Sequence, residues 1–141
     1  MLYWDSSAIV ASILNEKSGI KIDNFVRTIL GNRIYTSIIT PLEIESAIQR
    51  RLREKSLSLK EADKGRITST EFCKVAYLVI SDHYVLDMAL HLQKIYGLRP
   101  SDAIQLASAR IGAENPPKVH FLCLDNKLNE AAKREGFEVP F

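Results

Sequence analysis

Cysteine and long hydrophobic runs are both scarce in this sequence, and each shortage excludes a class of protein. Only two of the 141 residues are cysteines, Cys73 and Cys123. No disulfide framework is expected, and both are interpreted as reduced core residues of a cytosolic protein. No apolar run approaches the roughly 20 residues of a membrane-spanning helix. An apolar strand follows Met1 directly, without a signal peptide. We therefore expect a cytoplasmic protein with no membrane segment.

Several common catalytic signatures are also missing. The sequence contains no glycine-rich phosphate loop, no dinucleotide-binding fingerprint and no Ser/His/Asp or Cys/His arrangement. His83, Asp87 and His91 are spaced as one face of a helix. A transition metal could use that spacing, but it is more typical of a solvent-facing surface. His120 lies inside a predicted strand and is expected to be a packed residue.

The length and composition are those of a single globular domain. Hydrophobic residues make up 46% and charged residues 26% of the chain, as in ordinary soluble proteins. A chain of 141 residues is long enough to bury a core without disulfide or metal support. We therefore expect residues 1–141 to form one domain, without repeats or linkers.

Positive charge is concentrated in one stretch, from Arg50 to Arg66. This stretch holds seven basic residues against three acids, a net +4, so the remainder of the chain carries −2. Such a run is typical of a solvated helix face. It is also typical of a surface that contacts a phosphate backbone or an acidic partner.

Short apolar segments alternate with helical patterns along the chain. Strands are predicted at 2–4, 34–37, 78–80 and 119–124, with a further edge strand at 137–139. Apolar stripes at 9–14 and 22–30, together with capping residues ahead of later segments, predict the helices. Capping boxes at Thr40–Glu43 and Ser58–Glu61 mark two helix starts, the first with Leu42 on its buried side. Strands that alternate with helices predict an α/β fold with a parallel sheet covered on both faces.

Four acids occupy comparable points in this pattern. Asp5 and Asp125 directly follow predicted strands, Glu43 lies one turn into the helix after the second strand, and Asp102 opens an apolar helix. Ligands of parallel sheets bind beyond the carboxyl ends of the strands, where these acids should gather. Each acid also has a simpler explanation: Asp5, Asp125 and Asp102 (or Ser101) as helix N-caps, and Glu43 as part of its capping box.

The joint pattern of four acids favours a metal site. Two carboxylates about 4 Å apart repel by about 4 kcal/mol at an effective dielectric of 20, so a cluster needs either cations or protons. Oxygen ligands without histidine or cysteine suit Mg²⁺ or Mn²⁺. Such an ion activates water and stabilises charge in phosphoryl displacement.

Four motifs of the chain resemble the PIN-domain family, and within it the VapC-type toxins of toxin–antitoxin pairs. The motifs are MLYWDSSA at 1–8, TS at 36–37 followed by EIESA at 43–47, LRPSDAIQLASA at 98–109, and FLCLDNKL at 121–128. The likeness spans the whole chain. Trp4 and Cys123 depart from the residues usual in the family, and neither change removes a ligand.

The resemblance implies a three-layer α/β/α sandwich with a central parallel sheet, and a ribonuclease that depends on Mg²⁺ or Mn²⁺. It also implies a homodimer that is inhibited by a cognate antitoxin protein. Carried over by position, the catalytic and metal-binding acids would be Asp5, Glu43, Asp102 and Asp125, with Ser7 as a supporting hydroxyl. The leading hypothesis is thus an endoribonuclease that cleaves RNA phosphodiesters.

Two other hypotheses remain open at this stage. One is a non-catalytic PIN-like module that binds RNA or protein, with the acids kept as helix caps. The other is a receiver-like phosphorylation domain, which is also doubly wound with acids at the sheet edge. That architecture needs two adjacent acids after its first strand, whereas Asp5 is followed by Ser6 and Ser7.

Overall fold

A sheet of parallel strands forms the middle of the molecule. The computed structural model describes residues 1–29, 31–113 and 116–141, so Leu30, the last residue of one predicted helical stripe, lies outside it. The strands pair in the order β3-β2-β1-β4, and all their pairings are parallel. They are β1 (Leu2–Trp4), β2 (Ile34–Ser37), β3 (Tyr77–Val79) and β4 (His120–Leu122). The predicted parallel sheet is therefore confirmed.

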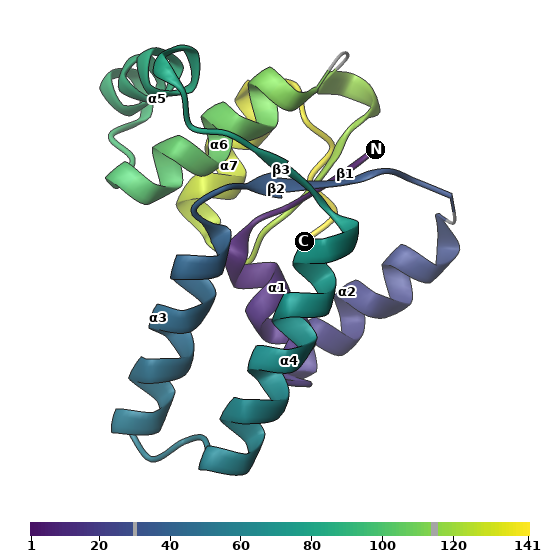
Figure 1. Ribbon diagram of the computed structural model, residues 1–141. Coiled ribbons are helices and arrows are strands. Elements are labelled where there is room, and N and C mark those ends of the chain that lie inside the picture. Colours follow the sequence, from purple (N-terminus) through teal and green to yellow (C-terminus); the bar gives the residue numbers. More distant parts are fainter. Residues whose placement is uncertain (30, 114–115) are drawn as a thin grey trace.

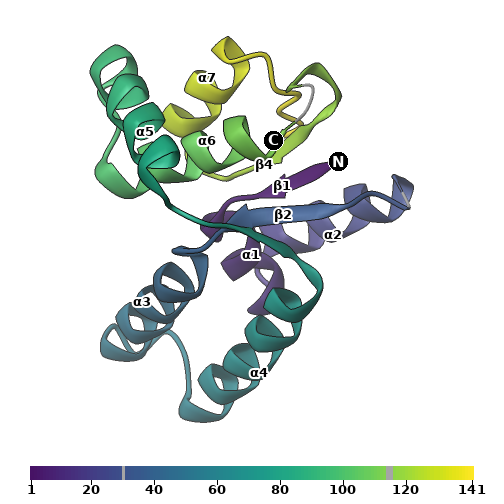
Figure 2. The ribbon, with the colours of Figure 1, turned by 45° about the horizontal axis from the view of Figure 1, so that its top comes forward.

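Helices cover both faces of this sheet, which gives the expected three layers (Figure 1 and Figure 2). One face carries α1 (Ser6–Ile13), α2 (Lys17–Thr28), α3 (Thr40–Arg53) and α4 (Leu59–Val75). The other carries α5 (His83–Tyr96), α6 (Pro100–Gly112) and α7 (Asn126–Arg134), and a short 3-10 turn, η1 (Pro116–Lys118), precedes β4. Within the described ranges, no helix combines the length and the apolar character needed to cross a lipid bilayer.

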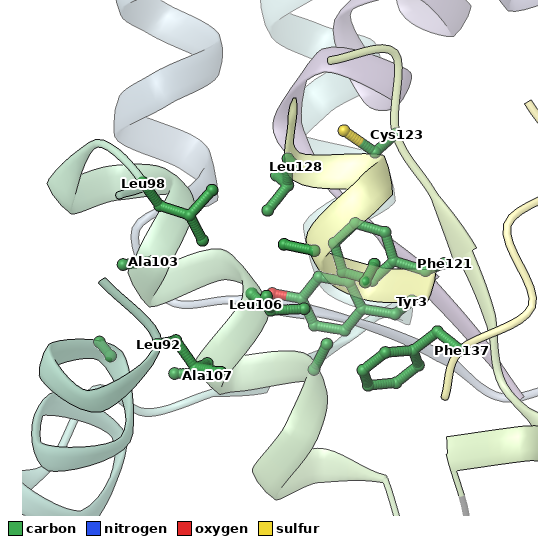
Figure 3. Packing of buried hydrophobic residues seen from close by; sticks show 14 of the residues in the cluster. Tyr3, Leu92, Leu98, Ala103, Leu106, Ala107, Phe121, Cys123, Leu128 and Phe137 are labelled. Atoms are coloured by element: carbon green, nitrogen blue, oxygen red, sulfur yellow. The ribbon is translucent and has the colours of Figure 1, made fainter. Parts of the chain in front are cut away.

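The alternation of side chains along β1 divides the core in two. Leu2 and Trp4 pack into a cluster with residues of α1 to α4. Tyr3 points the other way, among α5 to α7, where its ring stacks on Phe121 with centroids 5.3 Å apart. Figure 3 shows this second cluster, with the Tyr3 hydroxyl directed toward α6. The strand that precedes Asp5 is thus held from both faces.

The strand predictions differ from the structure at their ends. The strand predicted at 78–80 lies at Tyr77–Val79, and the one predicted at 119–124 is limited to His120–Leu122. The C-terminal edge strand is reduced to a single bridge between His120 and Glu138. The shorter β4 leaves Cys123 and Leu124 in the loop that leads to Asp125.

The two predicted capping boxes have different outcomes. The Ser58–Glu61 box is present in full at the start of α4. The Thr40–Glu43 box is wrong, although α3 does begin at Thr40: its N-cap is Ile39, and no side chain caps the helix. The Thr40 hydroxyl instead lies 2.7 Å from Thr36 Oγ1 in the core. Leu42, expected to be buried, is 72% exposed.

Candidate active site

A cleft of about 720 Å³ opens at the carboxyl edge of the sheet. Strand ends and helix starts supply its walls, and its lining includes all four acids that the sequence singled out: Asp5, Glu43, Asp102 and Asp125. The loops after β1 and β4 carry Asp5 and Asp125, while α3 and α6 carry the other two. The fold therefore brings together four carboxylates that are far apart in the sequence.

Asp5 is the most deeply buried of these acids. It caps α1, accepting hydrogen bonds from Ser7 N at 2.9 Å and Ser7 Oγ at 2.5 Å, and it is only 4% exposed. Burial raises the pKa of Asp5 from 3.8 to about 6, with a smaller contribution from the nearby Glu43 carboxylate; the Ser7 hydrogen bonds oppose the rise. Ser7 Oγ also accepts from Leu124 N at 3.0 Å. Ser7 therefore links the loops after β1 and β4 and holds Asp5 between them.

Glu43 accepts a hydrogen bond from a residue of α6 that was not among the predicted site residues. Gln105 of α6 donates through Nε2 to Glu43 Oε2 at 2.5 Å. Gln105 is fully buried in a helix whose inner face is otherwise made of small and apolar side chains. A buried amide must find hydrogen-bond partners, and that requirement is the sequence signal that would have marked Gln105.

Asp102 and Asp125 share one cation from the same chain. Arg99 Nε donates to Asp102 Oδ2 at 3.0 Å, and Arg99 Nη2 donates to Asp125 Oδ2 at 3.3 Å. Asp102 is not the N-cap of α6; that position belongs to Arg99. Asp125 does cap α7, through Leu128 N at 2.9 Å. The capping explanation therefore holds for Asp5 and Asp125 and fails for Glu43 and Asp102.

The donor set of the cleft fits a hard divalent cation. Five carboxylates, the four above and Glu16, line it together with no histidine, and carboxylate oxygens are the ligands of Mg²⁺ or Mn²⁺. As the side chains stand, the described residues contain no cluster of three or more His, Cys, Asp or Glu donors close enough to hold a metal ion. The guanidinium of Arg99 supplies positive charge between two of the acids, and its side chain is 76% exposed. An exposed arginine can leave without disturbing the core, which would free both carboxylates.

Arginines of the basic stretch also line this cleft. Arg50, Arg51 and Arg53 all contribute to its walls. Arg51 is engaged by Glu16 at 2.5 Å. Among the ion pairs formed within the described ranges, none involves Arg50 or Arg53. Arg66 lies outside the lining and pairs with Glu45 and Asp63. In the basic stretch, Arg51 and Arg66 are therefore paired with acids, whereas Arg50 and Arg53 line the cleft without an ion pair among the described residues.

The weaker candidates of the sequence lie away from the cleft. His83, Asp87 and His91 are exposed on α5, as expected for a solvated face. His120 is a packed residue, as expected: its ring meets Phe25 edge to face, and its Nδ1 lies 2.9 Å from Glu138 Oε2.

Both cysteines are free, as predicted, but only Cys123 is a core residue, since Cys73 is half-buried on α4. Cys123 is fully buried, and burial raises the pKa of its thiol. Its sulfur accepts a hydrogen bond from Asp125 N at 3.2 Å, so it shapes the loop that carries the last acid.

The molecule is a parallel sheet between two helical layers, with acids gathered at the strand ends. The chain matches the family model of the PIN domain over residues 2–133 and belongs to that family. Comparison with curated proteins gave no match. PIN domains are generally hydrolytic nucleases, often metal-dependent ribonucleases.

Proposed function

We propose that this chain is an endoribonuclease that depends on Mg²⁺ or Mn²⁺ and acts as the toxin of a toxin–antitoxin pair. One observation carries the proposal: a single cleft is lined both by the four acids that the sequence singled out and by arginines. Carboxylates can hold a cation, and arginines can hold the phosphates of a nucleic acid. The proposed functional unit is one domain, residues 1–141, working in the cytoplasm.

Asp5, Glu43, Asp102 and Asp125 would hold the cation. When bound, the ion would polarise a phosphodiester and lower the pKa of water. The chain's own residues prepare that site. Ser7 fixes Asp5 through two hydrogen bonds, and burial gives this carboxylate a pKa of about 6, so the site gains from an added positive charge.

Cleavage of circular RNA tests this function. Circularised RNAs of mixed sequence would be incubated with the protein in Mg²⁺, in Mn²⁺ and in EDTA. We expect linear products only with metal, and their loss in Asp5→Asn. Asp87→Asn, which makes the same change at an exposed position on α5, should cleave like the wild type. Intact circles with both metals, or equal cleavage by Asp5→Asn, would contradict the proposal.

A non-catalytic RNA- or protein-binding module is the second candidate. It is favoured by the fact that Asp5 and Asp125 cap helices and that Arg99 already pairs with two of the acids. Calorimetric titration with Mn²⁺ separates the two candidates. A module of this kind would bind RNA or a partner protein without binding Mn²⁺. The nuclease must bind both RNA and the ion.

We also propose a homodimer. Seven large hydrophobic side chains between Val75 and Ile95 are 49% to 69% exposed, and β3 within this stretch is an edge strand. Exposed apolar surface of this kind marks protein interfaces. Sedimentation should show a species twice the 15.9 kDa of the chain that is lost in Leu90→Lys and kept in Leu59→Lys. A single 15.9 kDa species at all micromolar concentrations would refute the dimer.

The proposed protein partner is an antitoxin that inhibits cleavage. Resemblance of the four motifs to VapC-type toxins supports it. A small protein encoded beside this gene should abolish the cleavage of circular RNA when it is added in equimolar amount. Undiminished cleavage, with binding also absent, would remove the toxin assignment and leave the nuclease assignment standing.

A further inference from the structure

A buried amide, that of Gln105, joins the core of the molecule to the cleft. Its side chain is fully buried and makes three hydrogen bonds. Oε1 accepts from Tyr3 Oη at 2.7 Å. Nε2 donates to Thr40 Oγ1 at 3.0 Å and to Glu43 Oε2 at 2.5 Å. Both polar atoms of this amide are therefore hydrogen-bonded, Oε1 to a residue of β1 and Nε2 to two residues of α3.

The hydrogen bonds around Gln105 allow only one orientation of its amide. Thr36 Oγ1 donates to Trp4 O at 2.7 Å, so the proton between Thr36 and Thr40 belongs to Thr40. Thr40 Oγ1 is then an acceptor and requires an N–H from Gln105. The Tyr3 hydroxyl donates its proton to Oε1. A flipped amide would place an oxygen against the Glu43 carboxylate.

This arrangement sets the position of one carboxylate oxygen in the cleft. Glu43 is half-buried and lines the cleft. A glutamate side chain has several freely rotating bonds, and ordering it without a fixed partner costs conformational entropy. Residues that hold a metal ligand by a hydrogen bond commonly change metal affinity or activity by about 10-fold to 100-fold when replaced.

We propose that Gln105 is a positioning residue that holds Glu43 in the orientation needed to bind the divalent cation, with Tyr3 and Thr40 fixing the amide. The inference rests on the proposed function, in which Glu43 is a metal ligand. It adds a role for a residue that touches neither the ion nor the RNA. Because Gln105 lies one turn after Asp102 on α6, the same network also ties together β1, which Asp5 directly follows, and the two helices α3 and α6, which carry Glu43 and Asp102.

The test replaces Gln105 by methionine, which keeps the length of the side chain and removes its hydrogen bonds. Calorimetry with Mn²⁺ should show affinity lowered by at least about 10-fold in Gln105→Met, with cleavage of circular RNA lowered in parallel. Ser69→Ala is the control, since it removes another buried hydroxyl, on α4 and outside the cleft lining. Its Mn²⁺ affinity should stay at the wild-type value.

A double-mutant cycle with Glu43→Gln distinguishes positioning from general support of the fold. If Gln105 acts through Glu43, then Gln105→Met should lower Mn²⁺ affinity no further in the Glu43→Gln background. An equal loss in both backgrounds, an equal loss in Ser69→Ala, or unchanged affinity in Gln105→Met would overturn the inference. If Glu43→Gln alone binds Mn²⁺ with wild-type affinity, Glu43 is not a metal ligand. That result would contradict the proposed function, and the single variant is enough to show it.

Tyr3→Phe provides a second variant in case Gln105→Met does not fold. It keeps the amide and its bond to Glu43 and removes only the hydroxyl that orients it. We expect a smaller loss of Mn²⁺ affinity in the same direction, again absent in the Glu43→Gln background. A loss of equal size in that background would overturn the inference.

Discussion

Arg99 lies against Asp102, with its Nε donating to Asp102 Oδ2 at 3.0 Å. The same guanidinium reaches Asp125 through Nη2. The two carboxylates that the proposal assigns to a metal ion are thus paired with a cation from their own chain. Arg99 and the metal ion would compete for the same oxygens.

Replacing Arg99 should therefore strengthen metal binding. Arg99→Gln removes the competing charge, so Mn²⁺ affinity should rise by up to about 5-fold, the equilibrium equivalent of an exposed ion pair. The melting temperature without metal should fall slightly, and added Mn²⁺ should raise it by more than in the wild type. Calorimetry and thermal melts measure both effects.

Arg110→Gln is the control for that experiment. Arg110 pairs with Glu135 at 3.6 Å and does not line the cleft. Its replacement should leave Mn²⁺ affinity unchanged. Weaker Mn²⁺ binding in Arg99→Gln would mean that Arg99 supports the site rather than competing for it.

Asp5 gives the metal-free protein a defined dependence on pH. Its pKa in the folded chain is raised from 3.8 to about 6, chiefly by burial. The folded state therefore holds this proton more tightly than the unfolded state does. The stability that Asp5 contributes is present in full below pH 3.8 and is lost as the pH rises through 6.

Asp5→Asn should remove this loss of stability. Without metal at about pH 7.5, its free energy of unfolding should exceed that of the wild type by on the order of 2 kcal/mol, and the difference should vanish near pH 4. Urea unfolding in EDTA at both pH values measures this, with Asp87→Asn as the control. A variant less stable than the wild type at neutral pH would show that the charge of Asp5 stabilises the fold.

The cleft arginines should carry the salt dependence of RNA binding. Reversing charge at Arg50 and Arg53 should weaken the binding of single-stranded RNA in EDTA and reduce the slope of log K against log salt by about 1.4, at about 0.7 per phosphate contact. Lys60→Glu with Lys64→Glu makes the same change on α4, outside the cleft lining. Fluorescence anisotropy over a salt series compares the pairs. Equal slopes in the two double variants would contradict a phosphate-binding role for the cleft arginines.

The order of strands and helices could be predicted from the sequence because it depends on local patterns. Alternating apolar strands and capped helices specified the three layers. The same local reasoning located the boxes at Ser58 and Thr40, and only the first formed. At Thr40 the hydroxyl is hydrogen-bonded to Thr36 of β2 and to Gln105 of α6, and Gln105 lies 65 residues away along the chain. No local pattern contains that competition.

The members of the candidate site could be named from the sequence, but their partners could not. Asp5, Glu43, Asp102 and Asp125 stand after strands or at helix starts, so topology alone brings them to one edge. The contacts of Gln105 with Glu43, and of Arg99 with Asp102 and Asp125, depend on side-chain directions that appear only in three dimensions. The presence of Arg50 and Arg53 in the same cleft as the acids likewise depends on the direction of α3 relative to the sheet.

Asp102→Asn tests the central claim most directly, by measuring RNA cleavage and thermal melting on the same preparations. Loss of this charge should abolish most metal-dependent cleavage, with a milder loss in the more exposed Asp125→Asn. The melting temperature without metal should stay level or rise, because relief of repulsion among the acids offsets the lost pair with Arg99. The stabilisation by Mg²⁺ should shrink. Full cleavage by Asp102→Asn, with an unchanged response to Mg²⁺, would show that this acid serves only to pair with Arg99 and would contradict the nuclease assignment.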